Sequence, residues 1–137
     1  MSLNSFIKTS GRTGLHIYVP IYRRLDFSAV HAAAKTFSTF LYNQHPEEIT
    51  TEWKVTKRIG KIFMDYNQNV RGKTLASIYS PRPVPQATVS TPLRWDEIEK
   101  VYPIDFTMRT VLERLTRIGD LWLNILEKRT DLEKALV

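Results

Sequence analysis

Four prolines within twelve residues constrain the fold of this 137-residue chain more than any other feature. They are Pro81, Pro83, Pro85 and Pro92. Proline lacks the backbone N–H that a helix interior or a central strand needs, so this segment excludes both elements. It predicts an extended connection that ends in an edge strand at residues 89–91.

The chain before these prolines has the patterns of strands and of one long helix. Four short apolar or alternating runs predict strands, at residues 5–8, 15–20, 49–53 and 61–66. Asp26 predicts a helix N-cap, because apolar residues recur every three to four positions after it until Pro46 prevents continuation. Residues 71–79 fit either a helix or a strand.

The chain after the prolines predicts three helices. Residues 95–101 favour a short one. Thr110 and Glu113 have the spacing of a capping box and predict the start of a second helix that stops at Gly119. Asp120 predicts the cap of a last helix with an apolar face. We therefore expect an α/β (α+β) fold in which a mostly antiparallel sheet is flanked by helices.

Composition narrows the class of protein. The length suits a single domain, 1–137, and a hydrophobic content of 42% suffices for a core. The chain contains no cysteine, which excludes disulfides, thiolate metal sites and a cysteine nucleophile. Its apolar runs are too short for a bilayer span and its N-terminus lacks the organisation of a secretory signal, so we expect a soluble, cytoplasmic protein with no membrane partner.

The net charge of +6 is concentrated in two segments. Residues 1–24 carry +4 and residues 54–82 carry +6, whereas residues 25–53 carry −3 and residues 83–137 carry −1. Clustered Lys and Arg suit a polyanion such as a nucleotide or a nucleic acid. A solvated basic face that aids solubility is the competing interpretation.

Asp65 is the candidate metal ligand. It follows an apolar run, so its carboxylate is expected at a strand end, where Mg²⁺ or Mn²⁺ shared with substrate phosphates could bind it. One carboxylate is too few for a two-metal site. A lone Asp after a strand also serves commonly as a turn or cap residue.

The loop at residues 10–14 and the prolines supply candidate phosphate ligands. Ser10 and the loop glycines can offer a hydroxyl and backbone N–H groups, and His16 can offer an imidazole N–H. Arg82 lies between two prolines, which favours a fixed bidentate reach, and Lys73 adds a looser charge. A polar loop and a structural histidine are the competing interpretations.

Five ordered motifs resemble the polymerase domain of bacterial DNA ligase D, a member of the archaeo-eukaryotic primase superfamily that works in non-homologous end joining. The resemblance covers residues 6–122. The motifs are Ser-Gly-Arg-Thr-Gly-Leu-His at 10–16, Asp-Tyr-Asn-Gln-Asn at 65–69 with Arg-Gly-Lys-Thr at 71–74, Tyr-Ser-Pro-Arg at 79–82, Val-Ser-Thr-Pro-Leu-Arg-Trp at 89–95 and Asp-Phe-Thr-Met-Arg-Thr-Val at 105–111.

The resemblance implies a role for each matching residue. The family's third catalytic, metal-binding carboxylate falls on Asp65, and its triphosphate contacts fall on Ser10, His16 and Arg82. Gln68 and Lys73 match the family's nucleotide site as well. Asp65 and the side chains at positions 10, 16 and 82 are expected to converge on one open pocket for nucleotide phosphates. The implied ligands are a nucleoside triphosphate, Mg²⁺ or Mn²⁺, and DNA.

The family's Asp-x-Asp pair lies upstream of the Ser-Gly loop, and this chain begins just before that loop. We therefore expect a truncated polypeptide or a natural fragment that is inactive alone, with the N-terminal half, a ligase domain and end-joining factors as partners. The competing class is a non-catalytic nucleic-acid-binding or interaction module that keeps the fold. A phosphoesterase using His16 with Asp65 is a third option, although the three histidines show no metal-binding spacing.

Overall fold

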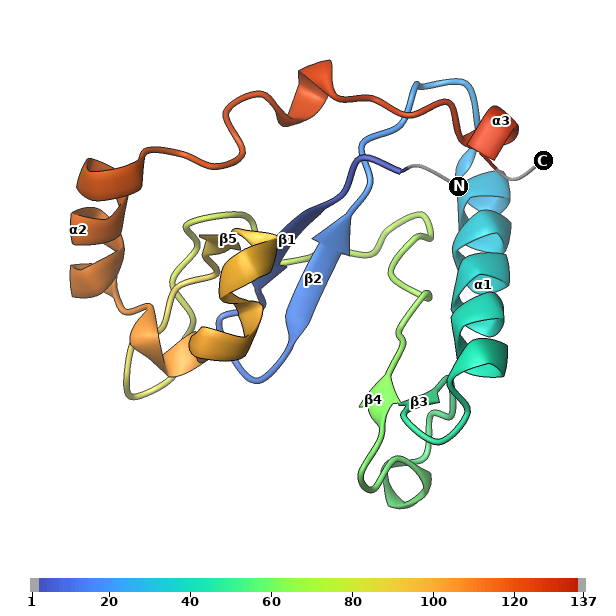
Figure 1. The fold of residues 1–137 in the computed structure, drawn as a ribbon, viewed down its shortest axis with the longest axis horizontal. Helices are drawn as coiled ribbons and strands as arrows, with labels where there is room; N and C mark the ends of the chain where they lie inside the picture. Colours follow the sequence, from blue (N-terminus) through green and yellow to red (C-terminus); the bar gives the residue numbers. More distant parts are fainter. Residues whose placement is uncertain (1–2, 136–137) are drawn as a thin grey trace. The chain divides into compact units, whose positions relative to one another are not determined.

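The computed structural model describes residues 3–135, and its chain divides into two compact units. The first unit consists of Met1–Tyr22 and Ala76–Val137, and the second consists of Arg23–Leu75. Both contain strands and helices, which confirms the mixed α/β class expected from the sequence (Figure 1). The units are described separately below.

A three-stranded antiparallel sheet forms the centre of the first unit (Figure 1). Strand β1 (Phe6–Thr9) lies between β2 (Leu15–Tyr18) and β5 (Pro92–Leu93). The hairpin register places Lys8 directly opposite His16. The expected hairpin is confirmed, and the polar loop that joins its strands leaves the sheet next to these two side chains.

The edge strand was expected at residues 89–91, and this position is wrong. The strand is Pro92–Leu93, whereas Val89 forms only an isolated bridge with Pro81. Pro92 is tolerated because β5 pairs on one side only, with β1. The preceding residues instead fold against the segment that begins at Tyr79, through Tyr79 N–H to Ser90 O (2.7 Å) and Ser90 N–H to Ser80 O (3.0 Å).

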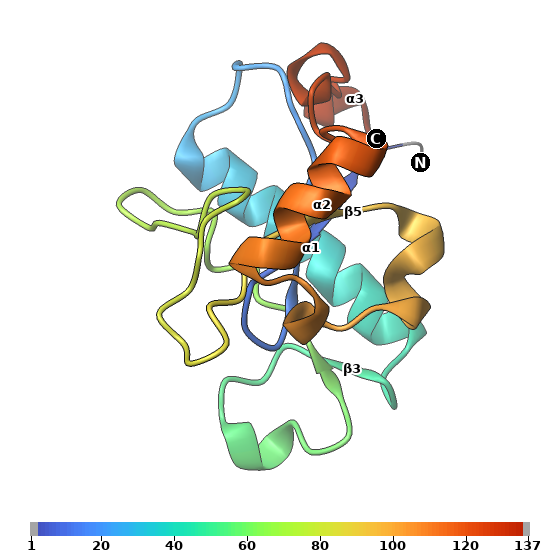
Figure 2. The same cartoon turned by 90° about the vertical axis from the view of Figure 1, so that its left-hand side faces the viewer.

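The core of the first unit joins the sheet to helix α2 (Met108–Ile118), which faces the viewer in Figure 2. Its buried members are Ile7, Val89, Leu93, Phe106 and Val111. Short helical segments complete the unit: η2 (Trp95–Lys100), η3 (Pro103–Asp105), η4 (Ile125–Glu127) and α3 (Leu132–Ala135). The short helix expected at residues 95–101 is thus a 3-10 helix.

Two expectations for the C-terminal helices are wrong. Helix α2 is capped by Thr107, whose side chain accepts from Thr110 N–H, so the capping residue precedes the predicted Thr110 by three positions. Gly119 ends the helix as predicted, with φ of +72°. Asp120 caps no helix; its carboxylate accepts from Tyr79 Oη (2.7 Å) and Trp122 N–H (2.9 Å) instead. Burial and this carboxylate raise the pKa of Tyr79.

The second unit is built on helix α1 (Phe27–Gln44), whose N-cap Asp26 accepts from Ala29 N–H (2.8 Å) as predicted. Two very short strands, β3 (Ile49–Thr50) and β4 (Ile62–Phe63), pair in parallel, and η1 (Val55–Lys57) lies between them. Residues 71–79 contain short turns at 71–72 and 78–79 and form neither helix nor strand. No helix within residues 3–135 is both long and apolar enough to cross a membrane.

Candidate functional site

Lys8 connects the two strands of the hairpin to Ala76, which precedes the proline-rich segment, and to Ser90, which lies within it. Its side chain is fully buried, and Nζ lies 3.0 Å from His16 Nδ1, 2.8 Å from the Ala76 carbonyl and 2.5 Å from Ser90 Oγ. The Ser90 hydroxyl in turn donates to the Thr9 carbonyl (2.7 Å). An ammonium has three donors, and three polar atoms lie within hydrogen-bond distance of it here, of which the Ala76 carbonyl and the Ser90 hydroxyl accept.

The charge around Lys8 is positive. Burial, and secondly the Arg82 guanidinium, lower the pKa of Lys8 from 10.5 to about 8, which leaves it mostly charged at neutral pH. Within residues 3–135, no carboxylate lies within ion-pairing distance of Lys8 or Arg82. Two cations without a compensating acid form a site that suits an anion.

The Ser-Gly loop is closed by its own hydrogen bonds. Ser10 Oγ accepts from Arg12 N–H and Gly14 N–H (3.1 Å each), and Ser10 N–H donates to the Gly14 carbonyl (2.8 Å). The amide of Gly14 is therefore not offered to a ligand, which corrects the sequence hypothesis. The hydroxyl proton of Ser10 has no acceptor among the described residues, so Ser10 retains one donor.

Arg82 lies against this loop. Its backbone N–H donates to the Thr88 carbonyl (2.7 Å), which fixes the residue within the proline-rich segment. A Cβ added to Gly11 would stand 2.5 Å from Arg82 Cγ, so the aliphatic stem of the arginine occupies the space over the glycine. Arg82 Nε is buried and has no hydrogen-bond partner among the described residues. A buried, unpaired guanidinium N–H is the donor that an anion would satisfy.

The first unit thus brings together three residues proposed from the sequence, Ser10, His16 and Arg82, and adds Lys8. Lys8 entered the sequence interpretation only as part of the charge count. The hairpin register could have indicated its role, because antiparallel pairing of β1 and β2 places position 8 opposite position 16 on the same face. The contacts to Ala76 and Ser90, far along the chain, carry no local signal.

Asp65 lies in the second unit, two residues after β4, and its side chain is exposed. Its Oδ1 accepts from Asn67 N–H (2.9 Å), and its Oδ2 accepts from Gln68 Nε2 (3.2 Å). Asp65 therefore closes a turn, and Gln68 orients its carboxylate. In the part of the chain that the structure describes, no three acidic, histidine or cysteine side chains cluster as a metal site. Asp65 can supply one oxygen ligand.

The basic segment of the second unit is partly engaged in local contacts. Lys57 pairs with Glu52 (3.7 Å), Arg58 stacks over the Phe63 ring (3.8 Å to the centroid) and Lys61 donates to the Pro46 carbonyl (2.7 Å). Lys73 is exposed, and its backbone N–H donates to the Val70 carbonyl (3.3 Å). Lys73 is therefore an exposed positive charge in this unit, and its place in a nucleotide site stays a prediction.

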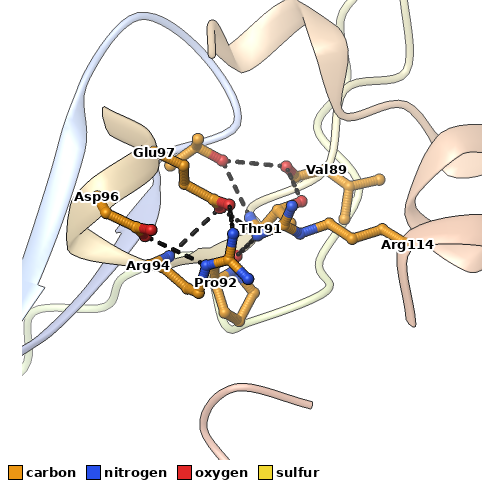
Figure 3. A network of polar contacts seen from close by, with 8 residues as sticks. Val89, Thr91, Pro92, Arg94, Asp96, Glu97 and Arg114 are labelled. Carbon is orange, nitrogen blue, oxygen red and sulfur yellow. Dashed lines mark hydrogen bonds and ion pairs between the residues drawn. The ribbon is translucent and has the colours of Figure 1, made fainter. Parts of the chain in front are cut away.

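The motif at residues 89–95 has a structural role. Figure 3 shows Arg114 of α2 pointing at Glu97, which it pairs with, and at the Pro92 carbonyl (3.2 Å). Glu97 also accepts from Arg94 N–H (3.3 Å) and is 8% exposed. This network ties η2 and α2 to β5 and thereby fixes one edge of the sheet whose other two strands carry Lys8 and His16.

A small antiparallel sheet with helices, and two cations, Lys8 and Arg82, beside a glycine-containing hairpin loop define an α/β domain. The chain belongs to the LigD primase-polymerase domain family, whose family model matches residues 1–122.

Relatives and a solved structure agree with this assignment. The chain is 33% identical over 121 residues to the multifunctional non-homologous end joining protein LigD of Mycolicibacterium smegmatis, covering 88% of this chain and 16% of the relative. It is 31% identical over 119 residues to the bifunctional LigD of Bacillus subtilis, covering 85% of this chain and 20% of the relative. The chain thus spans a fifth or less of these relatives.

The fold is similar to that of the polymerase domain from Mycobacterium tuberculosis ligase D, solved in complex with DNA. The TM-score is 0.84 at 30% identity, over 94% of this chain and 45% of that one. The mostly antiparallel α/β fold expected from the sequence, and the resemblance to the ligase D polymerase domain, are both confirmed.

Proposed function

We propose that this chain binds a nucleoside triphosphate as part of a primase-type DNA/RNA polymerase, a nucleotidyltransferase of an end-joining repair ligase. The observation that carries the proposal is the cationic cluster of the first unit, which consists of Lys8 and Arg82 with the adjacent Ser10 and His16. It combines the buried, unpartnered Arg82 Nε with the charged Lys8, and no carboxylate neutralises either group among residues 3–135. Such a cluster is costly to fold unless an anion occupies it.

Three side chains of this cluster are assigned to phosphate oxygens. Arg82 supplies a guanidinium held on a stiff backbone, Ser10 supplies its hydroxyl proton, and His16 supplies a ring N–H. Gln68 and Lys73 are proposed as further nucleotide-site residues, because they occupy matching positions of the family's second motif. Charge-assisted hydrogen bonds of this kind contribute roughly 1.5–3 kcal/mol each.

Asp65 is proposed as a ligand of Mg²⁺ or Mn²⁺. Its carboxylate is exposed and oriented by Gln68, so it fits the one hard oxygen ligand that such ions accept beside water and substrate phosphates. A bound ion of this kind would neutralise phosphate charge during nucleotidyl transfer. Asp65 itself contributes an oriented negative charge.

DNA is the proposed macromolecular partner. The solved relative is a polymerase domain in complex with DNA, and residues 54–82 of this chain carry +6. Lys and Arg that neutralise backbone phosphates give binding that weakens steeply with salt. Ligase domains and end-joining factors are proposed as further partners, because the relatives are multifunctional end-joining proteins.

Titration with fluorescent ATP tests the proposal. Arg82→Gln is expected to weaken binding about 10- to 100-fold, because it removes a charge-assisted donor. Arg109→Gln removes the same charge from an exposed position on α2 and is the matched control, expected to bind like wild type. Equal affinity of both variants would reject the assigned site.

A parallel titration with labelled duplex DNA at two salt concentrations tests the second partner. Affinity should fall as salt rises. DNA binding with no measurable ATP binding would instead identify the competing class, a non-catalytic nucleic-acid-binding module that keeps the fold.

A further inference from the structure

Lys8 is the most buried charged side chain among the described residues. Its three hydrogen-bond partners are His16 Nδ1, the Ala76 carbonyl and Ser90 Oγ. An ammonium can only donate, so with Lys8 charged the Nδ1 atom must accept. A neutral imidazole that accepts at Nδ1 carries its proton on Nε2.

The neighbouring groups enforce these directions. The Ser90 hydroxyl proton is directed to the Thr9 carbonyl (2.7 Å), so only lone pairs of Ser90 face Lys8. Ala76 presents a carbonyl, which also only accepts. The pKa of Lys8, lowered to about 8, still leaves the ammonium charged at neutral pH. The contacts are mutually consistent with charged Lys8 as the sole donor.

The sheet holds the two side chains in this relation. Lys8 and His16 are directly opposed in the β1–β2 register, so neither can move to the other face without breaking the hairpin. Tyr18 flanks the pair on the same face of β2, with its ring 5.8 Å from Lys8 Nζ. The orientation of the imidazole is therefore set by the strand pairing together with Lys8.

We propose that Lys8 is a positioning residue that holds His16 in the tautomer with its proton on Nε2, so that the ring presents an N–H donor to a nucleotide phosphate. The inference rests on the proposed function only for the identity of the acceptor; the tautomer is a property of the free protein. A purely structural lysine that ties β1 to residues 76 and 90 would not depend on which ring nitrogen carries the proton.

NMR of protein with ¹⁵N-labelled histidine, at pH 7 without nucleotide, measures the tautomer directly. His16→Gln assigns the signal among the three histidines. Wild type is expected to show His16 with its proton on Nε2, and Lys8→Met to show a mixture. Ser90→Ala removes another acceptor of Lys8 and is the control, expected to keep the wild-type tautomer. A proton on Nδ1 in wild type, or an unchanged tautomer in Lys8→Met, would overturn the proposal.

Raising the pH of wild type provides a second measurement that does not require a variant to fold. The groups facing Lys8 are His16 and Tyr18 of β2 and Arg82 of the proline-rich segment. Burial raises the pKa of Tyr18, and arginine stays charged, so Lys8 is the group that loses its proton above pH 8. A neutral amine can accept from Nδ1–H, so the second tautomer should appear between pH 7 and pH 9.5. A tautomer that is constant across this range would contradict the proposal that charged Lys8 determines the tautomer of His16.

ATP titration then tests the positioning role of Lys8 separately from the proposed nucleotide binding. Lys8→Met is expected to raise the ATP Kd about tenfold, and most of this effect should vanish when it is combined with His16→Gln, because Lys8 acts through His16. Fully additive effects would overturn the positioning role. If the wild-type protein shows the predicted tautomer but binds no ATP, the positioning role of Lys8 is supported and the proposed function is rejected.

Discussion

The side chain of Arg82 fills the space directly over Gly11, where a Cβ would stand 2.5 Å from Arg82 Cγ and 3.0 Å from the Ser90 nitrogen. Gly11 also has φ of +74°, a conformation that only glycine adopts without strain. Two independent reasons therefore require glycine at position 11: the positive φ of the loop backbone, and the close packing of the Arg82 side chain.

Gly11→Ala should displace Arg82 and weaken ATP binding as well as stability. The strained φ costs about 1–2 kcal/mol, and the clash adds to it. Gly60→Ala is the matched control, because Gly60 has φ of +73° but nothing within 4 Å of its added Cβ. Urea unfolding with ATP titration should show destabilisation in both variants and loss of affinity in Gly11→Ala alone. Unaltered ATP binding by Gly11→Ala would contradict this account of the loop.

Asp65→Asn should remove the divalent-ion dependence of ATP binding while leaving binding without metal nearly intact. Asparagine keeps a side-chain oxygen that can accept from Asn67 N–H but has lost the charge that Mg²⁺ or Mn²⁺ requires. We expect the enhancement by Mn²⁺ to fall about tenfold by isothermal titration. Asp96→Asn, at another exposed acid, should not alter it. A retained Mn²⁺ enhancement in Asp65→Asn would exclude Asp65 as a ligand.

ATP affinity and stability should respond to pH in opposite directions above pH 8. The folded-state pKa of Lys8 is about 8, below its ordinary 10.5, so between these values the unfolded chain holds more protons on this group. The contribution of Lys8 to stability therefore rises with pH across that window. ATP binding should weaken over the same range, because neutral Lys8 no longer holds His16 in the tautomer that presents Nε2–H. Lys8→Met should abolish both trends, measured by denaturant unfolding and ATP titration at pH 7, 8 and 9.5.

Arg114→Met should be among the most destabilising substitutions in the first unit. It leaves the buried carboxylate of Glu97 without its main partner, which costs roughly 3–5 kcal/mol. The double variant Glu97→Met with Arg114→Met should recover much of this loss. Asp96→Ala breaks an exposed pair with Arg94 and should cost less than about 1 kcal/mol. Thermal unfolding followed by circular dichroism measures all three, and a double variant no more stable than Arg114→Met would refute the buried-charge explanation.

The sequence by itself determined the local features of this protein and its family. The N-cap at Asp26, the stop at Gly119 and the hairpin around the Ser-Gly loop follow from backbone preferences within a few residues, and the ordered motifs identify the family. Strand β5 and the cap of α2 were misplaced by three positions. Their true positions are set by pairing with β1 and by the turn before α2, which outweigh local propensity.

The tertiary structure alone decided what Lys8, Gly11 and Arg82 do. Lys8 is an ordinary basic residue in the sequence, and it becomes the donor to His16 only because Ala76 and Ser90 return to enclose it. The packing of Arg82 on Gly11 likewise joins segments some seventy residues apart along the chain. Such contacts depend on how the whole unit closes around its core, and burial then changes both the charge state and the hydrogen-bond direction of the groups it encloses.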